Sequence, residues 1–145
     1  MKSTTWLRAV AIILGLFALG HTLGTAVPTV TRGPSEAAVF AVMQGYRFPV
    51  MGFERSYWEF YRGFALSISV LMAVMAAFAW QLAQLSKRSP GDVLPMAMTL
   101  LIGCIANMVV TLAFFFAAPM VFSIVVVVCA GMAVLRLRSE SLARG

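Results

Sequence analysis

The sequence predicts an all-α integral membrane protein, a four-transmembrane-helix bundle with a short interfacial helix in the outer loop between the first two spans. The chain has 145 residues, of which 61% are hydrophobic and only 11% are charged, more apolar surface than one soluble domain of this size can bury. Four apolar stretches are each long enough to cross a hydrocarbon core of about 30 Å, namely residues 6–27, 62–86, 94–117 and 119–135. We expect residues 1–145 to form a single membrane domain.

The first stretch also resembles a secretory signal peptide. Lys2 and Arg8 occupy the place of its basic region, and residues 24–26 offer a small-residue cleavage site. The same stretch contains His21 and the pair Gly20-xxx-Gly24, which a discarded leader does not need. We therefore expect a retained helix.

The loops differ in length and in the structure they predict. The loop at residues 28–61 is long and contains a helix-start signal, with Ser35 as the expected N-cap and Gly45 as the expected stop. The helix between them is too short to span the membrane and too apolar to remain in water. It should therefore lie at the membrane surface or cap the bundle, as part of a lid over the outer end. The last connection, at residues 117–119, is nearly absent and predicts a tight helical hairpin opened by Pro119.

The basic residues predict the orientation. Both termini should be cytoplasmic, in the bacterial inner (plasma) membrane, because seven basic residues then lie inside and four outside. The inner set is Lys2, Arg8, Lys87, Arg88, Arg136, Arg138 and Arg144, and the outer set is Arg32, Arg47, Arg55 and Arg62. The net charge of +6 is thus an orientation signal that also meets anionic lipid headgroups. It does not indicate a nucleic-acid surface.

The segment from Glu54 to Arg62 concentrates charges and aromatic rings at the mouth of the second span. If it is helical, Arg55, Glu59 and Arg62 share one stripe, on which Glu59 lies between two guanidinium groups. The structural alternative is a capping box, Ser56-Tyr-Trp-Glu59, inside an ordinary interfacial aromatic belt. The candidate ligand-binding residues of the segment are Glu54, Arg55, Tyr57, Trp58, Glu59, Tyr61 and Arg62.

His21 and Asn107 are further candidates. His21 should lie at about the depth of Glu59 and Arg62, and the flanking glycines would let a second helix approach closely enough to pair His21 with Glu59. That pair is the candidate catalytic acid and base, and its structural alternative is a hydrogen bond that ties two helices together. Asn107 either lines a pocket floor below His21 or bonds to a serine on another helix.

The sequence does not predict a metal site or a cofactor site. Cys104 and Cys129 have no CxxC spacing and are expected to be inert core thiols. One histidine without neighbouring cysteine or carboxylate ligands does not make a zinc site, and no methionine is identified as a haem partner for it. We therefore expect no metal and no cofactor.

Two motifs carry a resemblance that covers nearly the whole chain. Residues 17–24, which contain Gly-His-Thr-x-Gly, and residues 51–64, which contain Ser-Tyr-Trp-Glu-Phe-Tyr, resemble a group of short bacterial four-span proteins of unassigned function. The overall layout is also similar to that of DoxX-like membrane proteins. The resemblance implies membership of the group and supplies no activity.

Three function classes follow from these candidates. The favoured one is a non-enzymatic inner-membrane module that binds a lipid-like ligand or a membrane protein partner through an outer-leaflet pocket of polar and aromatic residues. The alternative is a small intramembrane enzyme of the proton-transfer or isomerase type, acting on a lipid-like substrate. A small transporter is the third. Homo-oligomers are also conceivable, because Gly20-xxx-Gly24 suits a helix dimer as well as a contact within the bundle.

Overall fold

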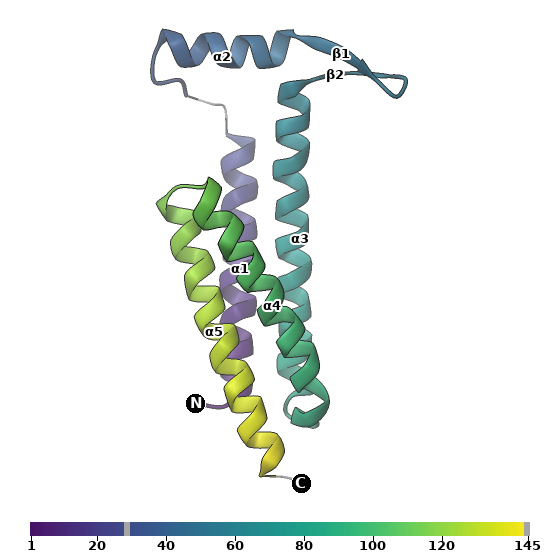
Figure 1. The fold of residues 1–145 in the computed structure, drawn as a ribbon, viewed down its shortest axis with the longest axis vertical. Helices are drawn as coiled ribbons and strands as arrows, with labels where there is room; N and C mark the ends of the chain where they lie inside the picture. The colour runs from purple at the N-terminus through teal and green to yellow at the C-terminus, as the bar shows by residue number, and fades with distance from the viewer. Residues whose placement is uncertain (28–29, 144–145) are drawn as a thin grey trace. The chain divides into compact units, whose positions relative to one another are not determined.

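The computed structural model describes residues 1–27 and 30–143 and contains five helices and one two-stranded sheet in that range (Figure 1). In chain order these are α1 (Ser3–Ala26), α2 (Pro34–Gly45), β1 (Arg47–Val50), β2 (Phe53–Ser56), α3 (Tyr57–Leu85), α4 (Pro90–Phe114) and α5 (Ala117–Leu142). Helices α1, α3, α4 and α5 are long and apolar enough to cross a membrane, and the short α2 lies between the first two of them. The predicted fold class is confirmed. Two parts of the sequence-based predictions, residues 28–29 of the outer loop and Arg144, lie outside the described residues.

All four spanning helices are longer than the apolar stretches that predicted them, and the extension is clearest in α3 and α5. Helix α3 begins at Tyr57 rather than at Arg62, and α5 continues to Leu142 rather than ending at Leu135. Charged residues close an apolar stretch but do not end a helix, because the backbone bonds continue beyond the hydrocarbon. On α5, for example, Leu137 is fully buried although its neighbours on either side are arginines.

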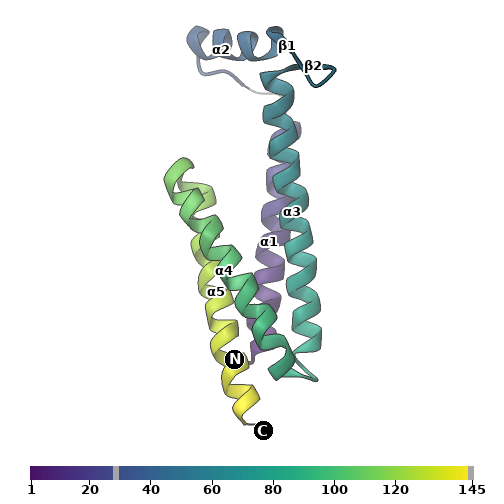
Figure 2. The same ribbon diagram turned by 45° about the vertical axis from the view of Figure 1, so that its right-hand side comes forward.

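The chain divides into two compact units, and the first combines Met1–Phe17 with Met72–Gly145. Its core takes small and aliphatic side chains from all four long helices, among them Leu7 of α1, Leu82 of α3, Val93 of α4 and Leu137 of α5. Helices α4 and α5 lie side by side in both views, joined by Phe115 and Phe116 (Figures 1 and 2). The tight hairpin is therefore confirmed, but its turn lies before the predicted residues 117–119, and α5 begins at Ala117 rather than at Pro119.

Polar contacts fasten the start of α1 inside this unit. The Ser3 N–H donates to the Glu140 carboxylate at 2.9 Å, and the Ser3 hydroxyl donates to the other oxygen of the same carboxylate. The Glu140 side chain thus satisfies a free donor at the N-terminus of α1, where an acidic group is also favoured by the helix dipole. Because Ser3 is fully buried, this contact joins the two ends of the chain firmly.

The glycines of α1 do not act as predicted. A Cβ added at Gly15 would lie 4.0 Å from the Cβ of Ala76, so α1 and α3 approach each other at that level. At Gly20 and Gly24 an added Cβ would meet no atom within 4 Å. Within the second unit, no helix therefore packs closely against these two glycines, contrary to the expected approach of α3.

The second unit, Ala18–Leu71, carries the outer segment. Within it, α2 and the strands lie crosswise at the start of α3 in both views (Figures 1 and 2). Helix α2 begins at Pro34 with Gly33 as its N-cap, so Ser35 belongs to the first turn and is not the predicted cap. The helix ends at Gly45, as predicted.

The antiparallel strands β1 and β2 were not predicted. Arg47 is paired with Ser56 and Val50 with Phe53, and the two residues between the strands both have positive φ, 48° at Met51 and 87° at Gly52. Positive φ at both central residues is typical of the two-residue turns that match strand twist. Since β2 ends at Ser56 and α3 begins at Tyr57, the hairpin is attached to α3 without a linker.

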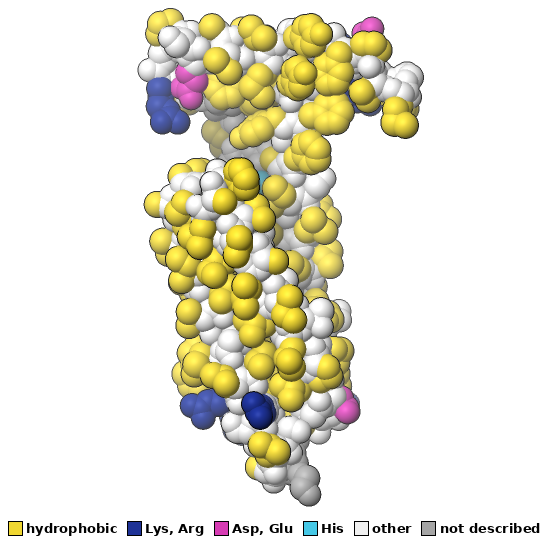
Figure 3. All heavy atoms as spheres, viewed as in Figure 1, with side chains coloured by type: hydrophobic (Ala, Val, Ile, Leu, Met, Phe, Trp, Pro, Cys, Tyr) yellow, Lys and Arg dark blue, Asp and Glu magenta, His cyan; other side chains and the backbone are white. Residues whose placement is uncertain are grey.

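The surface of the long helices is mainly apolar. In Figure 3, hydrophobic side chains cover the visible face of α4 and α5, and basic side chains gather near the end at which the chain termini lie. Large aliphatic residues such as Ile102 (65% exposed) and Val128 (55% exposed) point away from the core. Such a surface suits lipid and would be costly in water.

Candidate functional site

A capping box begins α3 and fixes the position of Glu59. The Ser56 N–H donates to Glu59 Oε2 at 2.6 Å, and the Glu59 N–H donates to Ser56 Oγ at 3.2 Å. These reciprocal bonds satisfy two free donors at the helix start, and Ser56 is buried. The interpretation of Ser56-Tyr-Trp-Glu59 as a capping box is confirmed.

The hairpin surrounds this cap with arginines. Arg47 of β1 lies between two carboxylates, with Nε 3.8 Å from Glu54 Oε2 and Nη2 3.9 Å from Glu59 Oε2. Arg55 belongs to β2, not to the helix, so the predicted helical stripe of Arg55, Glu59 and Arg62 does not form. Arg55 Nη1 donates to the Glu54 carbonyl at 3.0 Å, and its guanidinium lies over the Phe53 ring at 5.2 Å.

The aromatic side chains form two clusters around the same helix start. In the first, Tyr57 contacts the rings of Phe48 at 4.8 Å and Tyr46 at 6.1 Å, and Phe48 also stacks on Phe60. In the second, Trp58 meets Phe40 of α2 edge to face at 5.5 Å and stacks on Tyr61 at 5.4 Å. The contacts of Trp58 hold α2 against α3, and those of Phe48 hold the hairpin against α3.

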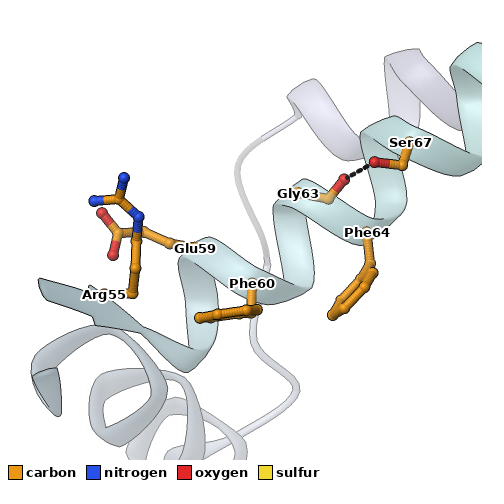
Figure 4. A pocket seen from close by; sticks show the side chains of 6 residues that line it. All are labelled: Arg55, Glu59, Phe60, Gly63, Phe64 and Ser67. Atoms are coloured by element: carbon orange, nitrogen blue, oxygen red, sulfur yellow. Dashed lines mark hydrogen bonds between the residues drawn. The ribbon is translucent and has the colours of Figure 1, made fainter. Parts of the chain in front are cut away.

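An open groove runs along the first turns of α3 (Figure 4). Its volume is about 320 Å³, and its lining residues are Arg55, Glu59, Phe60, Gly63, Phe64 and Ser67. The charged groups of Arg55 and Glu59 lie at one end, and the rings of Phe60 and Phe64 follow along the helix. Near the other end the Ser67 hydroxyl donates to the Gly63 carbonyl at 2.9 Å. The groove is therefore polar at the hairpin and apolar toward the middle of the span.

His21 pairs with a serine rather than with Glu59. Its Nδ1 lies 2.9 Å from Ser69 Oγ, which joins α1 to α3 inside the second unit, and Ser69 is buried. Glu59 comes ten residues before Ser69 on the same helix, which places the two about 15 Å apart along the axis. The predicted His21–Glu59 pair is not formed, because the facing residue on α3 is a serine.

Other predicted residues stand apart from the groove. Arg62 is exposed and makes no hydrogen bond or ion pair with the residues that the structure describes. Asn107 is exposed on α4 in the first unit and is not among the residues that line the groove. Cys104 and Cys129 are buried free thiols. Across residues 1–27 and 30–143, no three metal-ligating side chains come together.

Sequence reasoning missed five residues of this region: Arg47, Phe60, Gly63, Phe64 and Ser69. A signal for the groove was present, since Phe60, Phe64 and Ser67 follow one another at helical spacing on the side of Glu59. A signal for the hairpin was the Met51-Gly52 pair between short β-prone runs. Nothing in the sequence marked Ser69 as the partner of His21.

No protein-family model, curated protein or solved structure matches the chain. The site must therefore be interpreted from its own chemistry.

Proposed function

We propose that this protein is a non-enzymatic membrane module that binds a lipid-like ligand with an anionic head in the groove along the start of α3. The observation that carries the proposal is the polarity of the groove, which has the charged groups of Arg55 and Glu59 at one end and the rings of Phe60 and Phe64 along the helix, with Gly63 and Ser67 completing its lining. An amphiphile needs this order of surfaces, a cation for its head and apolar walls for its chain.

The head would be bound by Arg55. A guanidinium carries five N–H donors in a planar fork that fits phosphate or carboxylate. One of its nitrogens, Nη1, donates to the Glu54 carbonyl. Its other N–H groups have no hydrogen bond among the described residues, and the guanidinium lies beside the Glu59 carboxylate at the end of the groove (Figure 4). Arg47 is less suitable, because it already lies between the carboxylates of Glu54 and Glu59.

The apolar chain would lie along α3. Phe60 and Phe64 are 37% and 66% exposed, and Gly63 between them has no atom within 4 Å of the place where a Cβ would be. A hydrocarbon chain can therefore contact the helix backbone at Gly63 with a ring on each side. Because α3 continues as an apolar span, the chain would follow it into the bilayer.

The setting we propose is the bacterial inner membrane, with both termini cytoplasmic and the groove in the outer leaflet. Support comes from the excess of basic residues at the ends that would face the cytoplasm. The motifs around His21 and Trp58 further suggest that the chain belongs to the group of short bacterial four-span proteins that it resembles. Reporter fusions at each loop would test the orientation.

The test of the function compares two arginines of the outer segment. Wild type, Arg55→Gln and Arg32→Gln are purified in native-lipid nanodiscs, and bound lipids are identified by mass spectrometry. Arg32 is the matched control, because it is an exposed arginine that pairs with Glu36 and does not line the groove. We expect an anionic amphiphile enriched with wild type and Arg32→Gln and lost with Arg55→Gln. Equal lipid profiles for all three would refute the proposal and favour a protein partner.

A second candidate is an intramembrane enzyme acting on a lipid-like substrate, and the contact between His21 and Ser69 favours it. At 2.9 Å, the imidazole is close enough to exchange a proton with the hydroxyl. Accumulation of a substrate isomer in His21→Ala cells, with unchanged lipid binding in Arg55→Gln, would support this candidate over the binding module.

A further inference from the structure

Asn107 is a polar side chain on the outside of a membrane-spanning helix. It is exposed on α4 and lies about 10 Å from the Phe114 end and about 25 Å from the Pro90 end at the normal helical rise. Both distances place its carboxamide within the hydrocarbon of a bilayer, where an Asn side chain is too short to reach water.

Asn107 differs from the hydroxyl residues of the first unit. Thr99, Thr111 and Ser123 each donate to a carbonyl of their own helix, at 3.2, 2.8 and 2.8 Å. The main-chain carbonyl of Asn107 accepts the hydrogen bond from the Thr111 hydroxyl. The side-chain amide of Asn107, in contrast, has no hydrogen bond within residues 1–27 and 30–143. Lipid chains offer neither donor nor acceptor, so this amide needs a partner that the hydrogen bonds of the first unit do not supply.

The surface beside Asn107 allows another helix to come close. Gly103 lies one turn earlier on the same face, is exposed, and would meet no atom within 4 Å if it carried a Cβ. Ala106 and Val110 are also exposed on this side of α4. Small residues at this position let two helix backbones approach, and a neighbouring polar side chain can then bond across.

We propose that two copies of this chain associate through this face of α4, with the Asn107 carboxamides hydrogen-bonded to each other. A carboxamide is both donor and acceptor, so a second copy supplies the two groups that the first copy lacks. In a two-fold interface a residue near the axis meets its own counterpart. The glycine face of α1 is the competing surface, but its Thr22 and Thr25 hydroxyls already bond to carbonyls of α1 at 2.8 Å.

The protein is labelled and reconstituted in vesicles at a series of lipid dilutions. The number of copies in each complex is then counted by single-molecule photobleaching. Asn107→Leu should weaken dimerisation about 8- to 300-fold, which corresponds to the loss of the two reciprocal interhelical hydrogen bonds in a membrane. Asn107→Gln keeps the carboxamide and should restore most of the association. Ile105→Leu is the control, because Ile105 is exposed at nearly the same depth on the opposite side of α4.

Crosslinking locates the interface independently of its strength. In a background with Cys104→Ala and Cys129→Ala, Asn107→Cys should form an intermolecular disulfide on oxidation, and Ile105→Cys should not. The proposal is wrong if the protein stays monomeric at every density, as it would if another part of the same chain covered Asn107. It is also wrong if Asn107→Leu dimerises like wild type, or if both cysteine variants crosslink equally. None of these outcomes depends on lipid binding at Arg55.

Discussion

The hydrogen bond between His21 and Ser69 should contribute measurably to stability. It joins α1 to α3 at 2.9 Å, and Ser69 is only 6% exposed. Interhelical hydrogen bonds in membrane proteins contribute about 0.6 kcal/mol on average and up to about 1.7 kcal/mol. Ser69→Ala should lower the free energy of unfolding by an amount in this range.

Ser67→Ala is the matched control for this substitution. It removes the same hydroxyl two residues earlier on α3, where the Ser67 hydroxyl bonds to the Gly63 carbonyl of its own helix and the side chain is exposed. Reversible unfolding in bicelles, measured for Ser69→Ala, His21→Ala and the double variant, gives the coupling energy of the pair. A coupling energy of zero, or equal losses for Ser69→Ala and Ser67→Ala, would refute the assigned role of the bond.

Three further predictions concern stability in detergent. Leu7→Ala should destabilise by about 2–5 kcal/mol because Leu7 is 1% exposed, whereas Leu23→Ala, at a site 57% exposed, should change the thermal midpoint little. At the hairpin tip, Met51→Gly should leave stability equal or higher and Gly52→Ala should lower it, because both residues have positive φ; chemical unfolding curves with the opposite order would contradict the assigned turn. Glu140→Leu should lower the midpoint, since it removes the acceptor that holds the start of α1 to α5; an unchanged midpoint would show that this contact is unimportant.

The helical architecture could be predicted because it depends on the hydropathy and length of each stretch of sequence. A long apolar stretch must pair its backbone internally in lipid, so hydropathy and length alone indicate α1, α3, α4 and α5. The capping box at the start of α3 could also be predicted, since it depends on two residues, Ser56 and Glu59, that are only three positions apart. The hairpin was missed because its aromatic residues suited an interfacial belt equally well, and only the turn at Met51 and Gly52 distinguishes the two.

The partner of His21 could not be predicted for a different reason. Which residue of α3 faces His21 depends on the relative height and rotation of two helices, and apolar periodicity leaves both undetermined when most sides of a helix are apolar. Depth alone suggested the carboxylate of Glu59, whereas the facing residue is Ser69. For Arg55, the prediction assumed helical spacing, and the residue lies in β2.

The central claim, that the groove on α3 holds an amphiphile with an anionic head, can be tested directly by photocrosslinking in the membrane. A benzophenone amino acid is placed at Phe64, which lines the groove, or at Leu66, which is also exposed but lies on the other side of α3. Mass spectrometry then identifies the lipids attached at each position. The account predicts one class of anionic amphiphile enriched at position 64 and bulk lipid at position 66. The same lipid mixture at both positions would contradict it.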